Sequence, residues 1–138
     1  MRAEAVADQC RVCGCCSKKL RSAFRWRLIE EGNNNWLADL AAENPEEATF
    51  IQVKGPPEEA RSEAWHGLYF RAWEDLRFDR FYGAMGGETP ISYLAISRFA
   101  EDHGIRAEEF AQFKHFLQAI DAEWIKYVSE KAGSQGQR

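Results

Sequence analysis

The stretch RFYGAMGGETPI, from Arg80 to Ile91, decides how this chain folds. It holds three of the ten glycines, and glycine adopts backbone angles that other residues avoid. We therefore expect a long helix to end near Gly83 and the chain to reverse direction there. Thr89 is predicted to cap the next helix, and Pro90 to be its first residue, where the missing N–H costs nothing.

Helical periodicity on both sides of this stretch predicts an all-α fold with a small three-helix body. Each expected helix has an apolar face, and charged residues such as Arg80 are expected on the opposite, solvated face of the first one. Gly104 is predicted to end the second helix with a left-handed cap. The three expected helices cover residues 58–82, 90–103 and 107–131.

The preceding part of the chain, residues 1–57, is predicted to form a separate Cys-rich and basic N-terminal segment with a connector. It is attached to a helical domain over 58–138. A helix is expected over 17–31, capped by Ser17 and ended by Gly32. Residues 32–57 then read as an irregular connector. Within this connector we expect a short helix at 36–43 and a weak strand at 49–53.

Four cysteines occur within seven residues: Cys10, Cys13, Cys15 and Cys16. Zinc takes four tetrahedral Cys or His ligands, but structural sites usually combine two separated ligand pairs, and no second pair follows here. A redox Cys-x-x-Cys is disfavoured because no strand precedes it. We favour reduced thiols on a mobile segment, with zinc as the alternative, and we predict no metal site or cofactor.

The expected N-terminal helix is basic, which allows two interpretations. Its cations could lie on nucleic-acid phosphates, beside Trp26. The favoured interpretation is an ordinary solvated face on an amphipathic helix. The cations concerned are Lys18, Lys19, Arg21, Arg25 and Arg27.

Composition narrows the function further. The chain has 138 residues, 45% of them hydrophobic, and a formal net charge of -4, which argues against a protein built mainly to hold nucleic acid. No stretch approaches the roughly 20 apolar residues of a membrane helix, and the N-terminus lacks the apolar core of a signal peptide, so we expect a cytoplasmic protein. No nucleophile, metal-ligand or phosphate-loop motif is present, and we expect no enzymatic activity.

Residues 65–131 resemble a known family. The residues that carry the likeness are a Trp-rich helix, then Tyr-Gly-Ala-Met-Gly-Gly, Thr-Pro-Ile-Ser-Tyr at 89–93, Ala-Glu-Asp-His-Gly-Ile at 100–105 and Asp121-Ala-Glu-Trp124. This pattern resembles small helical tail-morphogenesis proteins of bacteriophages and prophages, of the tail assembly chaperone type. The resemblance implies a non-enzymatic protein of the host cytoplasm that holds a phage tail protein during assembly. Residues 1–57 have no counterpart in the pattern.

Nine Phe, five Trp and four Tyr supply more aromatic surface than three short helices need for a core. We predict that those outside the main apolar stripes contact a partner, although each could instead complete the core. The predicted partner-binding residues are Trp26, Trp36, Phe70, Phe78, Phe81 and Tyr82. The alternative function is a small nucleic-acid-binding regulator with a zinc-stabilised N-terminus and a basic helix.

Overall fold

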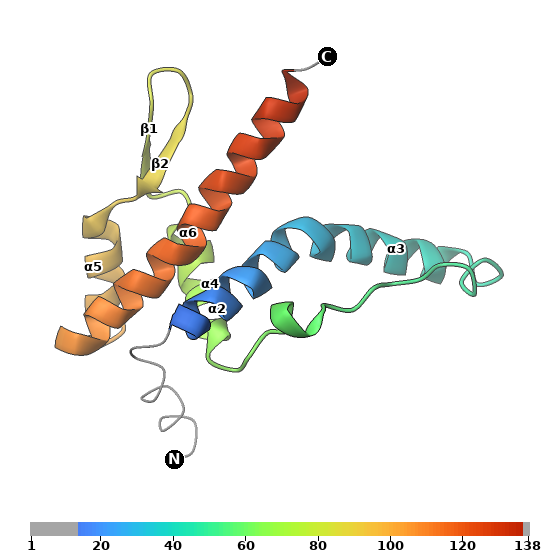
Figure 1. The fold of residues 1–138 in the computed structure, drawn as a ribbon, viewed down its shortest axis with the longest axis horizontal. Coiled ribbons are helices and arrows are strands. Elements are labelled where there is room, and N and C mark those ends of the chain that lie inside the picture. The colour runs from blue at the N-terminus through green and yellow to red at the C-terminus, as the bar shows by residue number, and fades with distance from the viewer. Residues whose placement is uncertain (1–13, 137–138) are drawn as a thin grey trace.

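The computed structural model describes residues 14–136, and this part of the chain is mainly helical with one projecting β-hairpin (Figure 1). The all-α expectation is therefore correct for most of the chain and wrong for the stretch at 80–91. In chain order the elements are α2 (Gly14–Trp26), a π-helical turn η1 (Arg27–Glu31), α3 (Gly32–Glu43), a 3-10 turn η2 (Glu58–Ala60), α4 (His66–Leu76), β1 (Arg80–Tyr82), β2 (Glu88–Ile91), α5 (Tyr93–Asp102) and α6 (Ala107–Gln135).

The glycine-rich stretch reverses the chain as predicted, but as the turn of an antiparallel hairpin. The Gly86 N–H donates to the Gly83 carbonyl at 2.9 Å, and the Gly83 N–H donates to the Gly87 carbonyl at 2.7 Å. Gly86 has a φ of +81°, in the left-handed region where a side chain would be strained. The turn therefore needs glycine at this position.

The start of α5 corrects the predicted cap. Thr89 and Pro90 lie in β2, and the cap is Ser92, whose hydroxyl accepts a hydrogen bond from the Ala95 N–H at 3.2 Å. The predicted C-terminal cap is confirmed. Gly104 has a φ of +69°, and the Ile105 N–H donates to the Ala100 carbonyl at 2.8 Å, which is a Schellman arrangement.

The helix predicted over 58–82 is wrong at both ends, because α4 covers only His66–Leu76. On its N-terminal side the residues around η2 are irregular, and the Glu63 N–H donates to Nδ1 of His66 at 3.1 Å. On its C-terminal side the chain turns after Leu76 to start the hairpin. The helical spacing of apolar residues continues through Arg80 in the sequence. The backbone of residues 80–82 is nevertheless extended, because it pairs with β2.

The helix predicted over 17–31 is longer than expected. Residues 14–43 form one helical run, in which Trp26, Glu31 and Gly32 all have helical backbone angles. Ser17 does not begin the helix, and Gly32 does not end it: a glycine inside a helix costs only about 1 kcal/mol. The expected strand at 49–53 is absent, since those residues form turns and irregular backbone.

One hydrophobic core joins α2, α4, α5 and α6. Phe24 of α2 contacts Trp73 of α4 with ring centroids 4.9 Å apart, and Trp73 contacts Trp124 of α6 at 5.4 Å. Leu20 and Ile120 are fully buried in the same cluster. The predicted domain boundary at 57/58 separates α2 from α4, α5 and α6. Among the described residues, however, these four helices share one core.

The cysteine predictions fall only partly within the described residues. Cys10 and Cys13 lie outside them, so the zinc alternative stays a prediction for that segment. Cys15 and Cys16, at the start of α2, are both disulfide-bonded, which corrects the expectation of reduced thiols for these two residues. Cys16 is also buried in the core.

The buried His66 generates a prediction about pH. Its side chain is 0% exposed, and burial lowers its pKa below the ordinary value of 6.5 because water no longer stabilises the charged ring. As the pH falls below 6.5, the unfolded chain takes up a proton that the folded protein does not. We therefore expect the free energy of unfolding to fall in this window.

Chemical denaturation between neutral and mildly acidic pH measures this dependence. In the control His66→Asn, the amide oxygen can still accept from the Glu63 N–H but does not titrate, so the decline below pH 6.5 should flatten. An equally steep decline in this variant would assign the effect to another group.

Candidate protein-interaction surface

A buried ion pair fixes the hairpin to the helical body. Nη2 of Arg80, the first residue of β1, lies 2.7 Å from Oδ1 of Asp121 on α6, and both side chains are almost completely buried. The same carboxylate accepts from Trp73 Nε1 at 3.1 Å and from the Ile91 N–H at 3.0 Å. Asp121 therefore connects α4, both strands and α6 through one side chain.

Further contacts strengthen the base of the hairpin. Nε of Arg80 donates to the Arg77 carbonyl at 2.6 Å, and Trp124 Nε1 donates to Glu88 at 2.5 Å. The Arg77 guanidinium lies 4.7–5.1 Å from three aromatic rings, which is cation–π distance. Those rings are Trp73, Phe78 and Trp124. A two-stranded hairpin is marginal by itself, so these contacts are what hold it in place.

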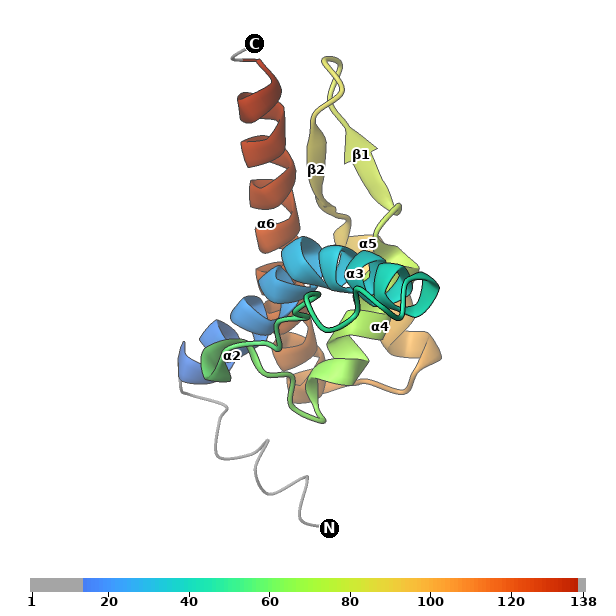
Figure 2. The ribbon, with the colours of Figure 1, turned by 90° about the vertical axis from the view of Figure 1, so that its right-hand side faces the viewer.

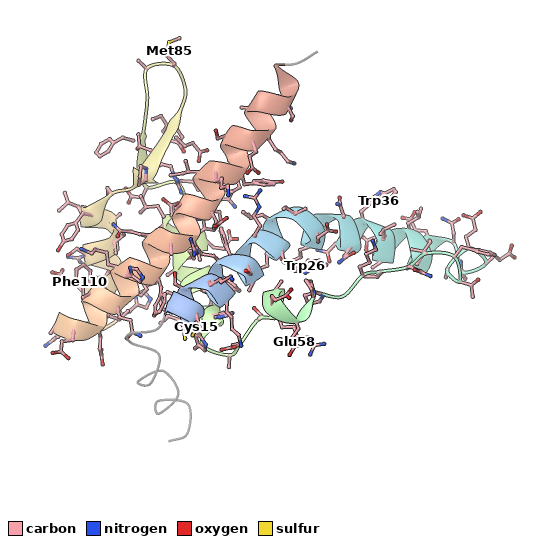
Figure 3. All side chains as sticks on the ribbon, in the orientation of Figure 1. Cys15, Trp26, Trp36, Glu58, Met85 and Phe110 are labelled. Atoms are coloured by element: carbon pink, nitrogen blue, oxygen red, sulfur yellow. The ribbon has the colours of Figure 1, made fainter. Side chains whose placement is uncertain are left out.

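Apolar side chains are exposed on the hairpin and in the turn that precedes it. Met85 at the turn is 100% exposed (Figure 3), Phe78 and Phe81 are each 75% exposed, and Tyr82 is 54% exposed. The hairpin and the C-terminal half of α6 both project from the same end of the body, as the two views agree (Figures 1 and 2). We call Phe78, Phe81, Tyr82 and Met85 the hairpin patch.

Three of the six predicted partner residues are exposed on the hairpin or just before it: Phe78, Phe81 and Tyr82. Trp36 is also exposed, at 63%, but it lies on α3, and Trp26 is half-buried at the end of α2. Phe70 is only 4% exposed. It packs against Phe24 with ring centroids 6.0 Å apart, so its prediction as a partner contact is wrong and it belongs to the core.

Sequence reasoning missed Met85, Arg80 and Asp121. The sequence predicts a chain reversal around Met85 but does not identify this methionine as a contact residue. Arg80 was expected on a solvated face, which the structure corrects. Asp121 carried a usable signal: it lies three residues before Trp124 and four after Leu117, and that spacing puts a carboxylate on the apolar side of the helix.

Part of the basic helix is paired with carboxylates. Nζ of Lys19 lies 3.0 Å from Glu63. The Arg27 guanidinium lies 3.3 Å from Glu31. Arg25 lies 3.7 Å from Glu123 and also contacts Glu130, both on α6. Three of the five cations are thus already paired, whereas Lys18 and Arg21 have no ion-pair partner among residues 14–136.

Other chemistry is sparse in the part of the chain that the structure describes. It holds no group of three or more His, Cys, Asp or Glu side chains that could hold a metal ion. Burial raises the pKa of Tyr69 to about 12, and this tyrosine packs against Phe113 and Phe116 inside the core. The most distinctive surface on these residues is the hairpin patch.

We predict that Asp121→Asn destabilises the protein by about 3 kcal/mol, because it leaves the buried Arg80 guanidinium without its charged partner. Urea denaturation measures the loss. The matched control is Asp102→Asn on α5, whose carboxylate lies 3.2 Å from Arg98 at the surface. An exposed pair of this kind should change stability by about 0.5 kcal/mol or less. Equal effects of the two substitutions would contradict the anchoring role.

Comparison with known proteins gives no guide to the function of this chain. No family model matches the sequence, and no curated protein and no solved structure matches it either. No described helix has the length and apolar character needed to cross a membrane. The function is therefore argued from the hairpin patch and the sequence pattern around it.

Proposed function

We propose that this chain is a non-enzymatic interaction factor that holds another protein through its hairpin patch. In this proposal the protein is a phage tail assembly chaperone, which acts in the cytoplasm of the bacterial host on a tail protein during morphogenesis. The observation that carries the proposal is an apolar patch on a hairpin whose base is fixed by a buried ion pair.

Exposure of the patch favours binding on energetic grounds. Completely burying a Phe or Met side chain stabilises a complex by about 1.5–3 kcal/mol. Aromatic side chains with few rotatable bonds also lose little entropy when they become ordered, and they are frequent among residues that dominate binding energy. The client chemistry that fits is an apolar segment left exposed before its own assembly is complete.

Rigidity at the base supports the same proposal. Arg80 and Asp121 hold β1 and β2 against α6 in the unbound protein, so the patch is already positioned when a client arrives. A positioned patch avoids part of the ordering cost of association. The tail protein as client rests on the resemblance over residues 65–131, which includes the hairpin sequence.

The proposal predicts that Phe81→Ser combined with Met85→Ser weakens capture of a tail protein at least tenfold, about 1.4 kcal/mol. The assay is co-expression with the tail proteins of the same phage, followed by affinity purification and titration of the captured protein. Both residues are exposed, so the variant should keep the helical circular dichroism of the unmodified chain.

Phe50→Ser provides the matched control. Phe50 is 85% exposed and belongs to the connector after α3, a segment that lies away from the hairpin in Figure 1. Its loss should leave capture unchanged. Equal weakening by both variants would indicate general stickiness of exposed aromatics. Unchanged capture by the hairpin variant, or no captured tail protein at all, would overturn the proposed function.

A further inference from the structure

A second exposed surface lies on the arm, which we define as residues 32–57: α3 and the connector that follows it. The arm projects away from the body (Figure 1), and none of the residues of α3 is buried. Its connector runs back beside the helix, where Nδ2 of Asn34 donates to the Lys54 carbonyl at 2.8 Å. Trp36 is left 63% exposed, although aromatic side chains bury large areas when a partner is present.

The exposed side of α3 combines this tryptophan with acidic charge. Trp36, Asp39 and Glu43 recur at spacings of three and four residues, which places them on one side of the helix, and all three are exposed. Glu46 and Glu47 follow, and no lysine or arginine occurs between Gly32 and Val53. A surface that covers α3 should therefore be basic and contain an apolar recess.

The body of the same chain carries a recess of that character. An open groove of about 610 Å³ runs along α2 and is bordered by η2 and α6. Trp26 and Ile29 contribute apolar surface to it, and Ala60 of η2 adds a small buried wall. This volume is large enough to receive an aromatic side chain. Figure 3 shows Trp26 close to η2 and Trp36 farther out along the arm.

Charge in the groove is complementary to charge on the arm. Its lining holds four cationic and three acidic side chains. Arg25 and Glu123 are paired with each other at 3.7 Å, which leaves three cations and two acids, Glu30 and Glu59, in the lining. Lys18, Arg21 and Lys126 have no ion-pair partner among residues 14–136 and are exposed at the rim, facing solvent. These are the side chains that Asp39 and Glu43 would meet.

An arm cannot occupy the groove of its own molecule. The groove lies along α2, and α2 continues through η1 into α3 as one helical run, so folding back would require breaking that helix. Direct pairing of two arms would bring acidic side chains together, which is unfavourable. The two complementary surfaces can meet only between different molecules.

We propose that the protein self-associates by docking the arm of one copy into the groove of another. Trp36 is the anchor that enters the apolar recess, and Asp39 and Glu43 pair with Lys18 and Arg21 of the receiving copy. The contact is heterologous, because the two participating surfaces are different. Every copy has one arm and one groove, so association can close into a ring or pair, or continue along a chain.

Sedimentation of the full-length protein over a range of concentrations tests this inference. The unmodified chain should associate as its concentration rises, and higher salt should weaken association because the charges at the rim are exposed. Trp36→Ser should weaken association at least about tenfold, since a central aromatic anchor usually dominates such a contact. A control, Phe81→Ser on the hairpin, should associate normally. A monomer at every concentration and at low salt would overturn the proposal.

A mixing experiment distinguishes this contact from other kinds of self-association. Trp36→Ser removes the arm contact but keeps the groove, whereas Lys18→Glu with Arg21→Glu removes the groove contact but keeps the arm. Each variant alone should remain monomeric. Mixed together they should form a one-to-one complex, because one intact arm and one intact groove remain. Absence of this complex, with both variants folded, would contradict docking of arm into groove.

The outcome is independent of the proposed chaperone function. Arm and groove variants should retain capture of a tail protein through the hairpin patch, and hairpin variants should retain self-association. If Trp36→Ser leaves the oligomeric state unchanged but abolishes capture of a tail protein, the arm binds the client and self-association through it is excluded.

Discussion

The ion pair between Arg80 and Asp121 is the interaction on which the rest of the structure depends. It is buried where α4, the hairpin and α6 meet, and Asp121 also accepts from Trp73 and from the Ile91 backbone. Two charges removed from water are stabilising only when every remaining polar atom finds a partner. Here the bonds from Arg80 to the Arg77 and Thr89 carbonyls supply such partners. The pair thereby specifies one position for a hairpin too short to be stable alone.

Sequence periodicity predicted the helices well where burial follows a single repeat. The apolar face of α6 and the Gly104 cap needed only local information, because the apolar spacing and the left-handed glycine act within one helix. The hairpin could not be obtained in this way. Residues 80–91 contain too few alternating side chains to indicate strands, and their backbone is determined by pairing with each other and by a carboxylate thirty residues farther along the chain.

In the arm, the sequence predicts a loop where the structure has a helix. Gly32 and the following asparagines indicate a loop, since their local preferences favour one, yet the helix continues through them to Glu43. Helical propensity is a weak preference that the neighbouring turns can override.

The candidate site was predictable only in part. The sequence identifies aromatic residues near the glycine-rich stretch as partner contacts, but it does not separate Phe70 from them, because only the packing of Phe70 against Phe24 shows that it belongs to the core.

The two exposed surfaces, the hairpin patch and the acidic arm with Trp36, are attached to the body by different physical means. The hairpin patch is fixed by a buried charge network at its base, whereas α3 of the arm continues the α2 helix and has no buried residue of its own. A partner on the hairpin therefore meets a surface that is already in position. A partner on the arm supplies contacts that the arm lacks, so docking there should order it further. The two surfaces share no residue, so a substitution on one leaves the side chains of the other intact, and every copy in a chain of docked molecules carries its own hairpin patch.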